Sequence, residues 1–279
     1  MSARSGKRGP VAARAGGADA RIRRKGRKLH SEEYLEARAI SLRIASEVDP
    51  PRFYLEKEEA VEASRAALEG HPTCRSVREL VEERGERMGH GMAHVLKVAV
   101  DAGALVLIES EVGREGEWEG RERTLLLVHL AGLLHDIRRD EPEHALKGAE
   151  EAETILRGFD VRDGERKAIT QAIRNHEAFK PAIPLEDPSL QVLSDALYDA
   201  DKFRWGPDNF TETLWSMAAP FRIPLEVLLR NFLPRMEGIR RIADTFRTPT
   251  GREYGPDFIA RGLEIGERLY RELAGMYGI

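Results

Sequence analysis

A strongly apolar run, TLLLVHLAGLLHDI at residues 124–137, carries the adjacent side chains His135 and Asp136 near its end. Its length and composition predict a buried helix at the centre of the fold. Burying an imidazole and a carboxylate together costs free energy unless something compensates, and a metal ion compensates well. The run therefore predicts a buried metal site at the end of a central helix.

The segments on both sides of this run also predict helices, because apolar residues recur at helical spacing and strand-like alternation is scarce. The pair Pro50-Pro51 should end a first helix, Pro142 should open a new one, and Pro234 should kink a helix near the C-terminus. A charged, glycine-bearing stretch at 110–122 predicts a loop. Helices are expected from residue 35 to the Pro50-Pro51 pair, over 56–68, from Ser76 or Gly91 onward, and over 124–136, 143–158, 163–177, 189–201, 225–236 and 258–276.

The predicted fold class is therefore all-α, a globular multi-helix bundle with extra N- and C-terminal helices. We expect a basic disordered tail at 1–30, an N-terminal helical extension at 31–75, a metal-binding core at 76–210, and C-terminal helices at 211–279 that pack on the core. The extra helices could cover the bundle or form the surface of a homodimer.

Composition limits the class of protein. The chain has 279 residues, 41% of them hydrophobic, which is enough for a sizeable core. Cys74 is the single cysteine, which excludes an internal disulfide and any multi-cysteine zinc or iron–sulfur site. No apolar run approaches the length of a membrane span, and the N-terminus has no apolar signal region. We therefore expect a cytoplasmic protein with no membrane partner.

The charge of the chain is divided unevenly. Residues 1–30 carry ten Lys or Arg and one Asp, a formal charge of +9, which leaves −13 on the remainder because the total is −4. The tail could bind nucleic acid, but it has no aromatic residues to stack on bases, so a solvated extension is the favoured interpretation. The acidic body argues against nucleic-acid binding by the folded part.

Helix faces bring further metal-capable side chains toward the pair at 135–136. His176 shares a face with Ile169, Ala172 and Ile173; His144 and His94 also lie on or beside apolar stripes. Asp201 lies on the stripe of Leu190, Leu193 and Leu197, whereas Asp199 is expected to be solvated, His129 to be a hydrogen-bonded core residue, and His90 to compete with His94. Imidazole and carboxylate together suit Mn, Fe, Co, Ni or Zn better than Ca²⁺.

The order of these motifs resembles the HD-domain superfamily of metal-dependent phosphohydrolases. The residues that carry the resemblance are His94-Val-Leu-Lys-Val, Leu-Leu-His135-Asp136-Ile, Ala-Ile-Arg-Asn-His176 and Tyr-Asp-Ala-Asp201-Lys-Phe, which span roughly residues 88–206. The resemblance implies that His94, His135, Asp136 and Asp201 bind a first divalent transition metal. His144 and His176 match positions that bind a second metal or the substrate phosphate in some branches, and Asp136 would then bridge the two ions.

Several features depart from the better-known two-metal branches. The intermediate histidine of those branches lies further beyond the HD pair, and their paired histidines and GYP motif are absent here. The gap between His94 and His135 is also long. A second metal is therefore left open.

The resemblance implies metal-assisted hydrolysis of a phosphate ester, with a nucleotide or related small phosphorylated molecule as substrate. His176 or His144 could donate a proton to the leaving oxygen. The cations that could face the phosphoryl group are Arg138, Arg139, Lys202, Arg204 and, in the connection before the last helix, Arg252. Two alternatives remain: a di-iron oxygenase on the same scaffold, and a non-catalytic regulatory protein that uses the basic tail as its binding arm.

Overall fold

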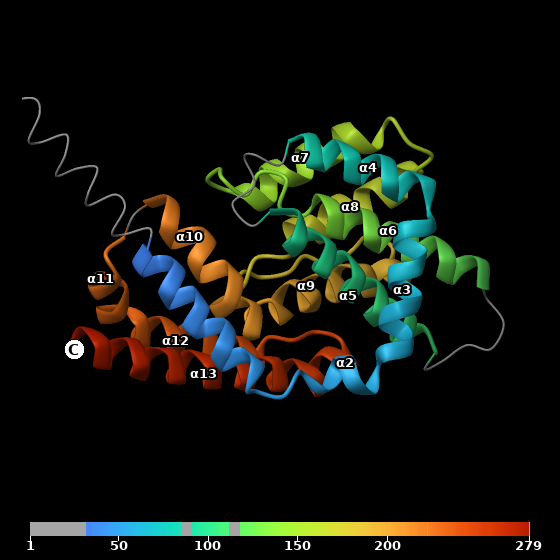
Figure 1. Ribbon diagram of the computed structural model, residues 1–279. Helices are drawn as coiled ribbons and strands as arrows, with labels where there is room; N and C mark the ends of the chain where they lie inside the picture. The colour runs from blue at the N-terminus through green and yellow to red at the C-terminus, as the bar shows by residue number, and fades with distance from the viewer. Residues whose placement is uncertain (1–31, 85–90, 112–117, 222, 279) are drawn as a thin grey trace, which may run out of the picture.

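The computed structural model describes residues 32–84, 91–111, 118–221 and 223–278 (Figure 1). All regular secondary structure within these ranges is helical, which confirms the all-α prediction. The basic tail at 1–30 and His90 lie outside the described residues. The middle of the charged stretch at 110–122 does as well, and helices occupy both of its described ends.

The helices follow the expected order. A helix at residues 32–46 is followed by α2 (Arg52–Glu56), α3 (Glu58–Gly70), α4 (Pro72–Glu83), α5 (Gly91–Glu111), α6 (Trp118–Leu134), α7 (His144–Leu156), α8 (Asp163–Arg174), η2 (Pro188–Leu190), α9 (Gln191–Phe203), η3 (Asn209–Thr213), α10 (Leu214–Phe221), α11 (Leu225–Arg230), α12 (Phe232–Arg240), η4 (Arg241–Asp244) and α13 (Pro249–Tyr277). α5 extends into the expected loop at 110–122, and α6 begins inside it at Trp118.

The expected single helix with a kink at Pro234 is wrong. The chain breaks instead at Asn231, whose φ and ψ of −101° and 2° separate α11 from α12. Pro234 is the third residue of α12, where a backbone N–H would have no partner within the helix. The proline therefore fits the first turn of α12 without the loss of a hydrogen bond inside the helix.

Helices α5 and α9 lie in the middle of the molecule, with α4, α7 and α8 on one side and α13 on the other (Figure 1). α5 packs against α3, α6 and α9. The helix at 32–46 packs with the C-terminal helices: Tyr34 makes an edge contact with Trp215, whose indole N–H donates to Ser41, and Arg43 pairs with Glu272. The helix at 32–46 and the C-terminal helices thus form one layer beside the core.

Residues 91–110 of α5 are long and apolar enough to cross a membrane by length and composition alone. The expectation that no apolar run approaches that length is therefore corrected. Val95, Val98 and Ala102 are fully buried within the protein, because α5 is covered by α3, α6 and α9. Such burial is typical of the central helix of a core.

Gly132 allows α5 and α6 to approach closely. A Cβ atom at this position would lie 2.6 Å from the Cα atom of Ala99 on α5. Backbone cannot move aside as a flexible side chain can, so the helices would have to separate. The glycine thereby sets the spacing between the helix that carries His94 and the helix that ends just before His135.

We expect Gly132→Ala to lower the free energy of unfolding by about 1–3 kcal/mol, since overpacking at a helix contact costs that much. Gly120→Ala on the same helix is the matched control, because a Cβ atom there meets nothing within 4 Å. The control should be neutral or more stable by up to about 1 kcal/mol. Urea unfolding measures both, and equal stabilities would show that the α5–α6 contact is not tight.

Candidate metal centre

The structure brings together six of the predicted site residues, which come from five parts of the chain. His94 lies in α5, and Asp201 lies near the end of α9. His135 and Asp136 follow α6 directly, His144 is the first residue of α7, and His176 lies just beyond α8. The metal-capable side chains therefore lie within or next to helices whose apolar residues pack into the core.

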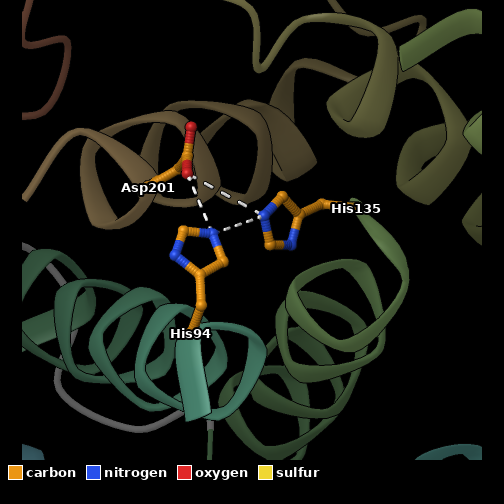
Figure 2. A group of neighbouring side chains, drawn as sticks. All are labelled: His94, His135 and Asp201. Carbon is orange, nitrogen blue, oxygen red and sulfur yellow. Dashed lines mark hydrogen bonds and ion pairs between the residues drawn. The ribbon is translucent and has the colours of Figure 1, made fainter. Parts of the chain in front are cut away.

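The first cluster consists of His94, His135 and Asp201 (Figure 2). The Nε2 atoms of the two histidines are 3.3 Å apart, and they lie 3.4 Å and 3.8 Å from Oδ1 of Asp201. Oδ2 of Asp136 completes the group, at 3.7 Å from Nε2 of His94 and 3.5 Å from Nε2 of His135. All four side chains are buried, so four ligand atoms face one small volume.

The second cluster consists of Asp136, His144 and His176. Oδ1 of Asp136 lies 3.5 Å from Nε2 of His176 and 3.8 Å from Nε2 of His144, and the two Nε2 atoms are 3.2 Å apart. His176 is buried, whereas His144 is partly exposed. This cluster therefore lies nearer to solvent than the buried side chain of His135 does.

Asp136 belongs to both clusters, with one carboxylate oxygen toward each. Its Oδ1 atom is buried and has no hydrogen-bond partner among the described residues. A buried carboxylate oxygen without a partner is costly, and the natural compensation is a cation. The shared carboxylate is the strongest sign that the centre holds metal.

Two histidines are oriented by backbone carbonyls. Nδ1 of His135 lies 2.8 Å from the carbonyl oxygen of Gly132, and Nδ1 of His176 lies 2.6 Å from that of Ile173. Each Nδ1–H can donate to its carbonyl, which leaves the Nε2 lone pair free to face its cluster. Metal-binding histidines are typically held in this way.

The charge states suit cation binding. Burial lowers the pKa of His135 to about 4, which keeps this imidazole neutral. Burial raises the pKa of Asp136, but His135, His176 and Arg139 together hold it well below its ordinary value. Burial likewise raises the pKa of Asp201, and Lys202 with His94 and His135 outweighs that effect. Neutral imidazoles and ionised carboxylates are the forms that bind divalent metals.

The structure gives Lys202 a different place from the one expected. Its ammonium group donates to Oδ2 of Asp201 and, at 2.7 Å, to the carbonyl oxygen of His176, and the side chain is buried. Oδ1 of Asp201 therefore faces His94 and His135. Lys202 is therefore placed to hold Asp201 and the backbone next to His176 in position.

The neighbouring arginines differ from each other. Arg139 lies within the centre: its Nη1 donates to Nε2 of His144 at 2.9 Å, and its Nε lies 3.9 Å from Oδ2 of Asp136. Arg138 pairs with Glu141 and Glu151 instead and is not part of either cluster. Only Arg139 of this pair is placed to meet a group bound at the centre.

The remaining predicted cations lie elsewhere. Arg204 is buried and pairs with Asp101 and Asp208, and Arg252 donates to the carbonyl oxygen of Phe246. His129 behaves as the hydrogen-bonded core residue that was expected, with its Nε2 atom 3.0 Å from Oγ of Ser64.

The expectation that Asp199 is solvated is wrong. Its carboxylate is fully buried and accepts 2.8 Å hydrogen bonds from the backbone N–H groups of Arg247 and Thr248 and from the Thr248 hydroxyl. Burial raises its pKa to about 6. Arg247 in turn donates to the carbonyl oxygen of Asn175, next to His176. Asp199 therefore fixes the start of α13 beside the centre.

Comparisons with known proteins agree with the geometry. Residues 91–205 match the family model of the HD domain. A solved structure described as a predicted HD superfamily hydrolase, from an uncultured Thermotogales bacterium, is 20% identical, with 71% of this chain and 92% of that protein covered. The two structures superpose with a TM-score of 0.43. No curated protein matches the sequence.

Proposed function

Because residues 91–205 form an HD domain, we propose that the chain is a metal-dependent phosphohydrolase that cleaves a phosphate ester of a nucleotide or a related small molecule. The observation that carries the proposal is the carboxylate of Asp136, which directs one oxygen to each of two ligand clusters. Two adjacent cation sites that share a ligand are common in enzymes that act on phosphate esters.

The donor set fits divalent transition metals. His94, His135, Asp136 and Asp201 would hold a first cation, and Asp136, His144 and His176 a second. Nitrogen and oxygen ligands of this kind suit Mn²⁺, Fe, Co²⁺, Ni²⁺ or Zn²⁺. Such a cation lowers the pKa of a coordinated water and polarises a phosphoryl oxygen.

The protein's own side chains would supply positive charge and a proton. Arg139 is the guanidinium at the centre, and it can turn from His144 toward phosphoryl oxygens, for which its planar fork is well suited. When no cation occupies the second cluster, His144, which is more exposed than His176, is the better placed of the two to give a proton to the leaving oxygen. Lys202 and the carbonyl oxygen of Gly132 hold the metal-binding side chains in place during the reaction.

The proposal is tested by screening purified full-length protein against nucleotides and other phosphate esters, after its metal content has been measured. We expect phosphate release that depends on added Mn²⁺, Co²⁺, Ni²⁺, Zn²⁺ or Fe²⁺ and that stops when the metal is chelated. A metal-loaded protein that releases no phosphate from any ester would contradict the proposal.

Arg139→Gln should lower kcat/KM by about a hundredfold, because it removes a guanidinium that lies at the centre and can stabilise developing phosphoryl charge. Arg138→Gln is the matched control, since that side chain pairs with Glu141 and Glu151 outside the centre. Its kcat/KM should stay within a few-fold of the unaltered protein. Equal losses in both variants, measured by steady-state kinetics, would remove Arg139 from the mechanism.

The three-residue second cluster also favours one other function, a di-iron oxygenase on the same scaffold. This reading requires two redox-active irons per chain and turnover that consumes oxygen. Iron analysis together with oxygen-uptake measurements separates it from hydrolysis, because phosphate release by the manganese- or cobalt-loaded protein requires no oxygen.

A further inference from the structure

The two peptide groups on either side of the Cα atom of His176 are each held by a cation. Lys202 donates to the carbonyl oxygen of His176 at 2.7 Å, and Nη2 of Arg247 donates to the carbonyl oxygen of Asn175 at 3.0 Å. Because a peptide group is planar, a hydrogen bond to its oxygen constrains the orientation of the whole group. These two contacts therefore constrain the backbone angles of His176 and, with them, the direction of its side chain.

Arg247 is itself held at both its backbone and its side chain. Its backbone N–H donates to Asp199 at 2.8 Å, and its guanidinium carbon lies 3.5 Å from the centre of the Tyr198 ring. Among the described residues, the carbonyl oxygen of Asn175 is the one hydrogen-bond acceptor of the guanidinium group. The structure thus directs this cation to a single carbonyl group, the one that precedes His176.

The carbonyl group that Arg247 binds lies at the end of a helix. α8 ends at Arg174, and Asn175 is its C-cap residue. The last carbonyl groups of a helix have no N–H partner within that helix, and they carry partial negative charge. A basic side chain is a favourable partner for them. Because Arg247 stands 72 residues after Asn175, its contact ties the start of α13 to the histidine that follows α8.

Arg247 and Lys202 differ in the clusters that they reach. Lys202 donates to Asp201, which belongs to the first cluster, as well as to the carbonyl oxygen of His176. The guanidinium of Arg247 donates only beside His176, which belongs to the second cluster. Loss of this guanidinium should therefore disturb the second cluster and leave the first intact.

We propose that Arg247 is a positioning residue for the second cation site, which it serves by orienting His176 through the carbonyl group of Asn175. This inference rests on the proposed function, which includes a second cation. The match to the HD-domain family ends at residue 205, so Arg247 lies outside the matched region. The start of α13 thereby completes a site to which it gives no ligand.

Arg247→Met tests the inference, because methionine keeps an apolar stem against Tyr198 but has no donor for Asn175. Calorimetric titration of the metal-free full-length protein with Mn²⁺, repeated with Co²⁺, counts the bound cations and measures the affinity of each. We expect two cations per chain in the unaltered protein. In Arg247→Met the affinity of one cation should fall about tenfold or more, the usual effect of losing a group that orients a metal ligand. The affinity of the other should stay within about twofold.

The variant His144→Ala shows which of the two sites is affected. His144 belongs only to the second cluster, so this variant should bind a single cation at the first cluster. Addition of Arg247→Met to this variant should leave the affinity of that cation within about twofold. A general loss of structure would weaken this cation as well, so the comparison separates positioning from stability.

Arg252→Met is the matched control, since Arg252 lies in the same segment and donates to the carbonyl oxygen of Phe246 instead. Both cation affinities should equal those of the unaltered protein. Arg247→Lys retains a positive charge and a donor, so it should weaken the second site by a smaller factor than Arg247→Met does. This milder variant keeps the test valid if the methionine variant fails to fold.

Three results would overturn the inference: a single cation per chain in the unaltered protein, unchanged affinities in Arg247→Met, or an equal loss at both sites. None of these results depends on phosphate release. If Arg247→Met weakens only the second site while no ester is hydrolysed, the positioning role is confirmed and the phosphohydrolase proposal is wrong. If esters are hydrolysed by a protein that binds one cation, the positioning role is wrong and hydrolysis is confirmed.

Discussion

Replacement of Asp136 with alanine should abolish cation binding at both clusters and reduce phosphoester hydrolysis by at least about a thousandfold. The reason is geometric. Oδ2 of Asp136 lies with His94 and His135, and Oδ1 lies with His144 and His176, so one substitution removes a ligand from each cluster. No other described side chain contributes to both clusters.

Metal analysis of the purified variant and steady-state kinetics measure this result, and circular dichroism should show unchanged helical content. Asp163→Ala is the control, because that carboxylate is 90% exposed at the start of α8. A variant at position 136 that retains bound metal and turnover would overturn the assignment of the centre.

Replacement of Lys202 with methionine should lower the free energy of unfolding of the metal-free protein by about 3–5 kcal/mol, the usual cost of leaving one charge of a buried pair alone. Lys202 is 2% exposed, and its ammonium group neutralises Asp201 and bonds to the carbonyl oxygen of His176. Methionine keeps most of the volume but none of the donors.

A bound cation changes this expectation, because it would supply the positive charge that Asp201 has lost. Saturating Mn²⁺ should therefore recover part of the lost stability, as seen in urea unfolding with and without the metal. Lys147→Met serves as the control, since Lys147 pairs with Glu141 at the surface and should contribute at most about 1 kcal/mol. A loss at Lys202 that is the same with and without metal would separate this residue from the cation site.

The ligand clusters could be predicted from the sequence because each residue is tied to an apolar pattern. An apolar run placed His135 and Asp136 at the end of a central helix, and helix faces directed His176, His144 and Asp201 inward. The helical class followed from the same periodicity. These features depend on the spacing of apolar residues within one helix, which can be seen in a single sequence.

The roles of the charged neighbours could not be predicted, because they depend on distant parts of the chain. Arg138 and Arg139 are adjacent in sequence, but the turn after α6 directs only Arg139 to the centre. The pattern of α9 alone predicts that Asp199 is exposed to solvent. In the structure the backbone at the start of α13 covers its carboxylate and supplies its hydrogen-bond donors. The sequence of α9 alone therefore cannot predict this contact.

Helix α13 begins at Thr248, which is hydrogen-bonded to Asp199. Near the other end of the helix, Glu272 pairs with Arg43 of the helix at 32–46. At 1.5 Å per residue its 29 residues span about 43 Å. Local unfolding of this helix would release both contacts together. We therefore expect hydrogen exchange in the helix at 32–46 and at the amides near position 248 to follow one shared opening equilibrium.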